Sequence, residues 1–181
     1  MIRLLGVLIL LLQPILASAE DLKALESPTA IVLMRHALAP GTGDPSGFRM
    51  DDCTTQRNLD DRGRDQARRI GERLRTQGIG FDAIWSSQWC RCRDTAALLG
   101  LGQVAEVPAL NSFFADRRQR DPQTKAALDK IAAVSGRRLL LVTHQVNITA
   151  LTGIYPQSGE IVVTEWRDGA LEVTGRILID P

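Results

Sequence analysis

Two short apolar runs that end in polar side chains constrain the fold most. Residues 31–34, Ile-Val-Leu-Met, precede Arg35 and His36, and residues 139–143, Leu-Leu-Leu-Val-Thr, precede His144. Runs of this length and composition are typical of strands buried on both faces. Ligands bind beyond the carboxyl ends of the strands in open parallel sheets. We therefore expect the chain's two histidines to lie at one functional site.

The rest of the sequence alternates between strand and helix patterns. Further strands are expected at about residues 81–85, 104–107, 160–166 and 170–179, and helices at about residues 61–77, 89–99, 121–136 and 147–151. Residues 38–58 are rich in Gly and Pro and should form a long loop, and their start directly after His36 favours a functional role. Alternating strands and helices predict a three-layer α/β/α domain with a mainly parallel central sheet.

The length and the N-terminus predict how the chain is organised. A chain of 181 residues fits one domain and needs no second. Residues 1–19 have the pattern of a secretory signal peptide, because Arg3 precedes an apolar core and Ala17-Ser18-Ala19 forms a small-residue cleavage site. An uncleaved anchor is the alternative, but the apolar run is well short of the ~20 residues of a membrane-spanning helix. We expect residues 20–181 to form one exported domain, periplasmic or secreted, without stable membrane insertion after cleavage.

Charge and cysteine content limit the partners. A formal net charge of +1 gives no reason to expect binding to nucleic acid. An exported chain can form one disulfide, and Cys90 and Cys92 point roughly 200° apart on a helix. Cys53 is therefore expected to bond to Cys90 or to Cys92. Neither a Cys-x-x-Cys pair nor a nearby histidine pair is present, so we expect no metal site. The oligomeric state stays open.

The polar residues at the strand ends suit a phosphoryl group. One guanidinium group can bind two phosphate oxygens at once, and imidazole can act as a nucleophile. Arg35 and His36 follow one strand, Arg91 lies on the helix after another, and His144 follows a third. The Gly-x-Ser-x-Gly elbow of serine hydrolases and the P-loop of nucleotide hydrolases are both missing from the sequence. Phosphoryl transfer through histidine is the chemistry that these residues favour.

Four sequence blocks resemble the histidine phosphatase (phosphoglycerate-mutase-like) superfamily. Residues 33–37, Leu-Met-Arg-His-Ala, are similar to its Arg-His-Gly signature, and residues 142–144, Val-Thr-His, to its Val-x-His. Residues 86–96 are similar to its Ser-Ser-Pro-x-x-Arg-Ala-x-Gln-Thr-Ala block. Residues 58–67 are similar to its Leu-Thr-x-x-Gly-x-x-Gln-Ala helix start. The four blocks follow one another in the family's order.

The resemblance implies a two-step hydrolysis of a phosphomonoester that needs neither metal nor cofactor. His36 would attack phosphorus and form a phosphohistidine, which water would then hydrolyse. Arg35, Arg91 and His144 would bind the remaining phosphate oxygens. The arginines should also keep the His36 imidazole neutral. The implied substrate is small and phosphorylated, and a sugar or envelope glycan is one candidate by analogy with small exported members.

The sequence departs from the family where many members carry the acid that protonates the leaving group. Residues 110–112 are Leu-Asn-Ser instead of Leu-x-Glu, and Gln145 follows His144 where other members keep an acid. Asp116 is the substitute that we predict as general acid. The missing acid keeps two alternatives open. One is a phosphohistidine protein phosphatase, and the other is a non-catalytic anion-binding domain of the same fold.

Overall fold

The computed structural model describes residues 22–179, so the signal peptide predicted for residues 1–19 lies outside the described part of the chain. The strands are β1 (Ile31–Arg35), β2 (Ala83–Ser86), β3 (Val104–Glu106), β4 (Leu139–Thr143), β5 (Ile161–Arg167) and β6 (Ala170–Ile177). The helices are α2 (Asp61–Thr76), α3 (Cys90–Leu99), α4 (Arg120–Ala132) and α5 (Gln145–Thr152), with short 3-10 helices η1 (Ala24–Glu26), η2 (Cys53–Thr55), η3 (Pro108–Leu110) and η4 (Arg117–Gln119). None of the helices within residues 22–179 is long and apolar enough to span a membrane.

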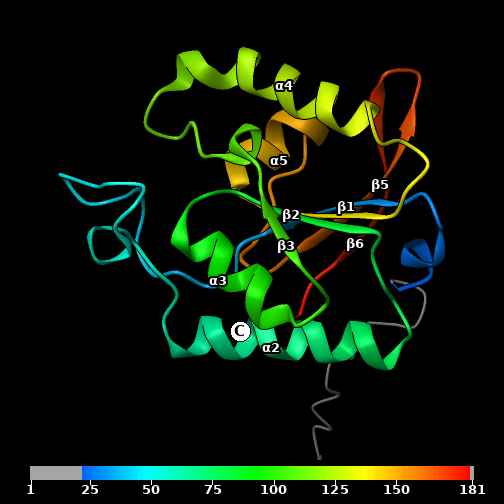
Figure 1. Cartoon of the computed structure of the whole chain (residues 1–181), viewed down its shortest axis with the longest axis horizontal. Helices are drawn as coiled ribbons and strands as arrows, with labels where there is room; N and C mark the ends of the chain where they lie inside the picture. The colour runs from blue at the N-terminus through cyan, green and yellow to red at the C-terminus, as the bar shows by residue number, and fades with distance from the viewer. Residues whose placement is uncertain (1–21, 180–181) are drawn as a thin grey trace, which may run out of the picture.

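The strands form one sheet in the order β3-β2-β4-β1-β5-β6. Every pairing among strands β1, β2, β3 and β4 is parallel, whereas β5 is antiparallel to both β1 and β6. Helices α2 and α3 cover one face of the sheet, and α4 and α5 cover the other (Figure 1). The predicted three-layer α/β/α fold with a mainly parallel sheet is confirmed.

The apolar runs of β1 and β4 are buried because both faces of the sheet are covered. Along β1, Val32 and Met34 pack with α2 and α3, whereas Ile31 and Leu33 pack on the opposite face with α4 and α5. Burial of each such side chain contributes roughly 1.5–3 kcal/mol. These central strands therefore provide a rigid base for the polar residues at their carboxyl ends.

The start of α2 lies against the loop that follows β1. The Asp60 carboxylate caps the helix by accepting a hydrogen bond from the Gly63 N–H at 2.8 Å. A Cβ atom at Gly63 would lie 2.0 Å from the Leu38 carbonyl oxygen, so only glycine permits this approach. One turn later, the Gln66 side chain accepts from the Leu38 N–H at 3.0 Å. The Gly-x-x-Gln pattern thus fixes the backbone just beyond His36.

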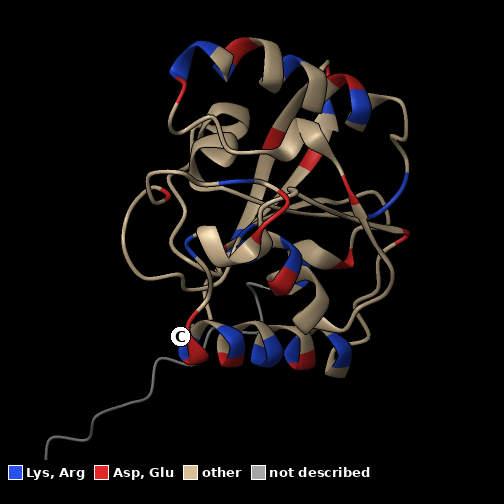
Figure 2. Ribbon diagram, turned by 60° about the vertical axis from the view of Figure 1, so that its left-hand side comes forward, with Lys and Arg blue, Asp and Glu red and all other residues tan. Residues whose placement is uncertain are grey.

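Helix α4 begins before the expected position. Its first residue is Arg120, one position before the expected start, so Asp121 lies in the first turn and does not cap the helix. The reason is η4, which leads directly into α4 and makes the backbone helical before Asp121 is reached. Helices α2 and α4 both carry exposed residues of either charge, so neither presents a face of one sign (Figure 2).

A disulfide between Cys53 and Cys90 fastens the long loop to the first turn of α3. The Cα atoms are 5.7 Å apart, and the bond joins residues separated by 37 positions. Cys92 is a buried free thiol. Of the two pairings that the sequence leaves open, the structure contains the one with Cys90.

Loss of this disulfide is expected to lower the free energy of unfolding by about 4 kcal/mol, because closing a loop of 37 residues reduces the entropy of the unfolded chain. The melting temperature should fall by roughly 8–16 °C in a domain of this size. Thermal unfolding of a Cys53→Ser/Cys90→Ser variant measures the effect. Reductant should lower the wild-type melting temperature by a similar amount and leave the variant unchanged. A wild-type protein insensitive to reductant would contradict the assignment.

Candidate active site

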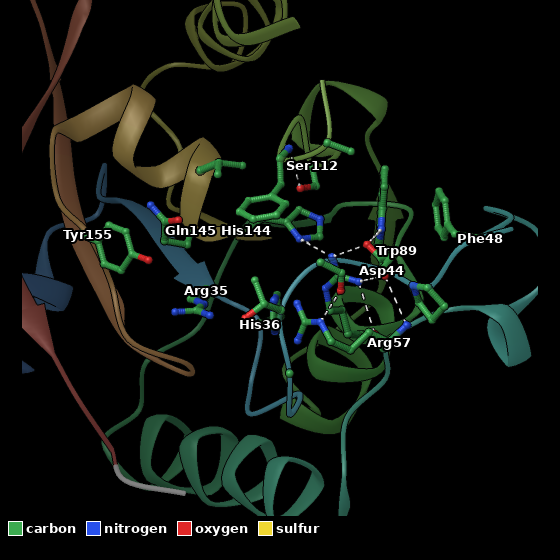
Figure 3. A pocket seen from close by; sticks show the side chains of 18 residues that line it. Arg35, His36, Asp44, Phe48, Arg57, Trp89, Ser112, His144, Gln145 and Tyr155 are labelled. Atoms are coloured by element: carbon green, nitrogen blue, oxygen red, sulfur yellow. Dashed lines mark hydrogen bonds and ion pairs between the residues drawn. The ribbon is translucent and has the colours of Figure 1, made fainter. Parts of the chain in front are cut away.

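A cavity of about 400 Å³ lies at the carboxyl ends of the central strands. Its wall contains the four residues that the sequence places in a phosphate site, which come from β1, its following loop, α3 and the end of β4 (Figure 3). These residues are Arg35, His36, Arg91 and His144. They come together because β1 and β4 are parallel neighbours in register, with Arg35 opposite Thr143.

His36 is held in one orientation by its own backbone and by the next residue. Its backbone N–H donates to the Thr143 carbonyl at 2.9 Å, and its ring nitrogen Nδ1 lies 2.8 Å from the Ala37 carbonyl oxygen. A carbonyl oxygen can only accept, so Nδ1 carries the ring proton. The other nitrogen, Nε2, therefore keeps its lone pair. This is the form of imidazole that can act as a nucleophile.

Both histidines are neutral at pH 7. Burial, followed by the charge of Arg91, lowers the pKa of His36 well below its usual value of 6.5. The same two causes, in the same order, lower the pKa of His144. The side chains are almost completely buried, and their ring centroids are 5.6 Å apart.

His144 adopts the opposite tautomer to His36. Its Nε2 lies 2.8 Å from the Ser87 hydroxyl, which donates to the Asn111 side-chain oxygen at 3.2 Å. Since the hydroxyl proton is directed to Asn111, His144 donates from Nε2. Its Nδ1 then accepts from Arg91 Nη2 at 3.4 Å. Nδ1 could donate a hydrogen bond to a bound anion only if the His144 ring became protonated.

Nitrogen NMR is expected to show both features directly, since the sequence contains only two histidines. His36 should appear as the Nδ1–H tautomer and His144 as the Nε2–H tautomer, and both should titrate below pH 6.5 because burial and Arg91 disfavour the charged ring. The measurement is a pH series of two-bond ¹H–¹⁵N correlation spectra, assigned with single His36→Ala and His144→Ala variants. A pKa at or above 6.5 for either ring, or the same tautomer for both, would count against this arrangement.

A carboxylate that the sequence did not single out holds Arg91. Asp44 accepts from Arg91 Nη1 at 2.7 Å and from Nη2 at 3.2 Å. It also accepts from Trp89 Nε1 at 3.0 Å and from the Arg57 backbone N–H at 3.3 Å. Burial raises the pKa of Asp44, but the hydrogen bonds and charge of Arg91 outweigh burial and bring the pKa below its usual value. Asp44 is therefore ionised at neutral pH and fixes the end of the Arg91 guanidinium.

Two buried donors at the site have no hydrogen-bond partner among residues 22–179. These are the Nε–H groups of Arg35 and Arg91, whereas the end of Arg91 is occupied by Asp44 and Arg35 Nη1 donates to the Pro156 carbonyl at 3.0 Å. A buried donor without a partner costs roughly 1–3 kcal/mol, and more when it is charged. An anion bound beside His36 could accept from both groups. The free energy lost in the empty site would then be recovered on binding.

The charge of the cavity wall comes from arginines. The cavity wall contains three guanidinium groups, those of Arg35, Arg57 and Arg91, and one carboxylate, that of Asp44. Burial, followed by the charge of Arg91, lowers the pKa of Arg57 to about 10, so Arg57 stays protonated at neutral pH. Within residues 22–179, no group of three or more His, Cys, Asp or Glu side chains could hold a metal ion. The wall therefore suits a dianion.

The structure does not bring Asp116 to the cavity. Its carboxylate accepts from Arg118 at 2.8 and 3.1 Å and caps η4, and the residue is absent from the cavity wall. Ser112 does line the cavity, so the segment in which other family members carry glutamate faces the site without an acid. Among the described residues, Asp44 is the carboxylate in the wall. The role predicted for Asp116 therefore lacks a geometric basis.

Sequence reasoning missed Asp44 and Arg57 at this site. Both lie in residues 38–58, the loop that was predicted to be functional because it begins at His36. Arg57 is fixed by its Nε, which donates to the Gly43 carbonyl at 2.7 Å, and by its Nη1, which donates to Ala39. The composition and position of the loop pointed to a function, but not to these two residues.

The model of the histidine phosphatase superfamily (branch 1) matches residues 31–113. This segment includes Arg35, His36 and Arg91 and three of the four sequence blocks, so the resemblance to the family is confirmed, while residues 142–144 lie outside the matched segment. No curated protein sequence matches the chain significantly.

Solved structures share the fold at low sequence identity. Phosphoserine phosphatase from Entamoeba histolytica, solved with 3-phosphoglyceric acid, has a TM-score of 0.62 and 14% identity, covering 83% of this chain and 97% of its own. The protein histidine phosphatase SixA, complexed with tungstate, has a TM-score of 0.58 and 14% identity, with coverage of 82% and 96%. A mycobacterial glucosyl-3-phosphoglycerate phosphatase has a TM-score of 0.54 and 18% identity, with coverage of 81% and 97%. At these identities the likeness establishes the fold.

Proposed function

Because the chain belongs to the histidine phosphatase superfamily, we propose that it is a phosphomonoester hydrolase with His36 as its nucleophile. The observation that carries the proposal is the pair of buried, unpartnered Nε–H donors of Arg35 and Arg91, in the same cavity wall as a neutral His36 with a free Nε2 lone pair. A phosphate dianion offers oxygens to both donors. It would also place phosphorus within reach of Nε2.

In the first step, the Nε2 lone pair of His36 attacks phosphorus in line with the leaving group. A nitrogen–phosphorus bond forms while the phosphorus–oxygen bond breaks, and its electron pair stays on the departing oxygen. Arg35 and Arg91 stabilise the charge that spreads over the other phosphate oxygens. The Nδ1–H of His36 continues to donate to Ala37, which supports the positive charge that the ring acquires. In the second step, water attacks phosphorus and gives up a proton to solvent, while the nitrogen–phosphorus bond breaks and its electron pair returns to Nε2. Inorganic phosphate then departs, and neutral His36 is restored.

The proton for the leaving group is the limiting feature of this site. Asp44 is ionised and engaged by Arg91, so it has no proton to donate at neutral pH. We infer that the leaving group takes its proton from solvent. Substrates with good leaving groups, such as aryl phosphates and phosphoramidates, should therefore react faster than simple alkyl phosphates.

Hydrolysis of 4-nitrophenyl phosphate tests the proposal. We expect turnover to persist in excess EDTA, because the arginines supply the positive charge that a metal would otherwise provide. Enzyme quenched during turnover with labelled substrate should carry phosphate that is labile in acid and stable in base, as phosphohistidine is. Loss of activity in EDTA would argue against metal independence. Turnover without such a phosphoenzyme would argue against the covalent route.

A second candidate is a phosphohistidine protein phosphatase. The specific observation in its favour is that no protonated carboxylic acid lines the cavity within the described residues. The fold shared with the protein histidine phosphatase SixA is consistent with it. A phosphohistidine peptide assayed beside sugar phosphates separates the two enzymes. Release of phosphate from any of these substrates excludes the non-catalytic anion-binding alternative.

We also propose that the domain acts outside the cytosol. The Cys53–Cys90 disulfide supports this, because such bonds persist in oxidising compartments. The proposal predicts a mature protein that starts at Glu20. N-terminal sequencing of protein recovered from the cell envelope or the medium checks it, and a chain that still begins at Met1 would contradict cleavage.

A further inference from the structure

We propose that the open end of the cavity binds a leaving group that is a ring with an apolar face, either a sugar or an aromatic ring. The contacts come from Phe114 and Tyr155, which we call the mouth. This inference rests on the proposed function, because it names the class of phosphomonoester that the same site accepts.

The first observation is where exposed aromatic surface occurs. Phe114 and Tyr155 are the exposed large hydrophobic residues among residues 22–179, at 43% and 71% exposure. Both belong to the wall of this cavity. An exposed aromatic side chain in the wall of a cavity of ligand size can contact what the cavity binds. Their position at the cavity connects them to what the cavity binds.

The second observation is that aromatic residues lie on different sides of the phosphate site. Figure 3 shows Tyr155 at one end of the site and Phe48 beyond Trp89 at the other, with His36 and His144 between them. Tyr155 precedes Pro156, whose carbonyl binds Arg35, so it stands beside that arginine. Phe114 lies close to Gly43, and Gly43 belongs to the loop that also carries Asp44. A group attached to a phosphate held beside His36 would leave the cavity past these rings.

The mouth is also partly fixed before a ligand binds. The Arg117 guanidinium carbon lies 5.1 Å from the Phe114 ring centroid. Elsewhere in the cavity wall, the Phe48 ring stacks on Trp89 at 5.1 Å. Rings held in this way lose little conformational entropy when a ligand stacks on them. The exposed Tyr155 can contact a ring with its face and a hydroxyl group with its own O–H.

Size and polarity agree with a ring-shaped leaving group. A cavity of about 400 Å³ is within the range of small-molecule sites and much larger than a phosphate group needs. Besides the aromatic rings, Thr42, Ser112 and Gln145 line it and offer hydrogen bonds to hydroxyl groups. Carboxylates other than Asp44 are missing from the described wall, and Asp44 is paired with Arg91, so no carboxylate there is left to pair with a charged group of the substrate.

Binding to the His36→Ala protein tests the mouth without requiring turnover. Two pairs of primary phosphate esters separate ring shape from leaving-group chemistry. They are glucose 6-phosphate against sorbitol 6-phosphate, and benzyl phosphate against n-hexyl phosphate. Calorimetry should show the ring member of a pair binding more tightly, and added Phe114→Ala or Tyr155→Ala should each reduce that preference roughly two- to tenfold. Added Tyr155→Phe keeps the ring and should keep the preference.

The outcomes separate this inference from the proposed function. Preference within the glucose pair alone identifies a sugar, and preference within the benzyl pair alone identifies an aromatic ring. Equal binding within both pairs overturns the inference even if wild-type enzyme hydrolyses aryl phosphates. If wild-type enzyme hydrolyses nothing, the proposed function fails while the binding data still decide on the mouth. A Phe114→Ala change that converts a dimer to a monomer without altering either preference would show a contact between copies instead, and would also overturn it.

Discussion

Replacement of His36 by alanine is expected to reduce turnover of 4-nitrophenyl phosphate by about 10⁴- to 10⁶-fold, as in enzymes that lose a covalent nucleophile. No nearby group can take its place easily. The Nε2 of His144 is committed to Ser87, and its Nδ1 faces Arg91. The labelled phosphoenzyme should disappear together with turnover. Steady-state kinetics and acid-quench labelling of wild type and variant provide the measurement.

Phosphate binding distinguishes a lost nucleophile from a damaged site. Arg35 and Arg91 remain in the His36→Ala protein, so the Kd for inorganic phosphate should stay within a few-fold of wild type. The buried ring leaves a cavity that lowers stability, so assays belong well below the melting temperature of the variant. If the folded variant keeps more than about 1% of wild-type turnover, His36 is not the nucleophile. If phosphate binding disappears as well, His36 acts in binding.

The central strands and the residues at their ends could be predicted because their signal is local. Residues 31–34 and 139–143 are buried on both faces of the sheet, so the chain reads as unbroken apolar runs. Parallel pairing then places the polar residues after each run at the same edge. His36 and His144 lie close together for this reason, although they are 108 positions apart in the sequence. The Asp-Gly pair at residues 168–169, between the two last strands, is a local turn signal of the same kind, and both residues have positive φ in the structure.

The residues that complete the site could not be predicted because their partners are distant and their loop has no period. Asp44 meets Arg91 across 47 positions, and neither a strand nor a helix pattern indicates which loop side chains point inward. The disulfide shows the same limit. Helix geometry left Cys90 and Cys92 as alternatives, and the orientation of α3 decides between them, because Cys92 lies 3.5 Å from His144. Asp116 was chosen by its place in the sequence, and η4 turns its carboxylate toward Arg118.

The Asp44→Asn change is expected to lower kcat by about 10²-fold, which is the effect of misplacing a catalytic group by about 1 Å. The carboxylate accepts two hydrogen bonds from the Arg91 end, while Arg91 Nε is left for the substrate. An amide of the same shape puts an N–H₂ group against one of those donors, so the guanidinium must turn. Removal of a negative charge from the cavity favours anion binding, which offsets part of the misplacement. We therefore expect a large fall in kcat with little change in the Kd for phosphate.

Asp116→Asn provides the matched control, because it is the same chemical change at a carboxylate outside the cavity wall. Its kcat should equal that of wild type for both an aryl and an alkyl phosphate. A selective fall with the alkyl phosphate would restore Asp116 as the general acid. For Asp44, the competing possibility is that its carboxylate occupies the position of a substrate oxygen and must leave when phosphate binds. In that case Asp44→Asn would bind phosphate several-fold more tightly and keep its kcat. A fall in kcat without tighter phosphate binding means that Asp44 positions Arg91. The carboxylate in the cavity wall would then act by orienting a guanidinium group, and not as the general acid.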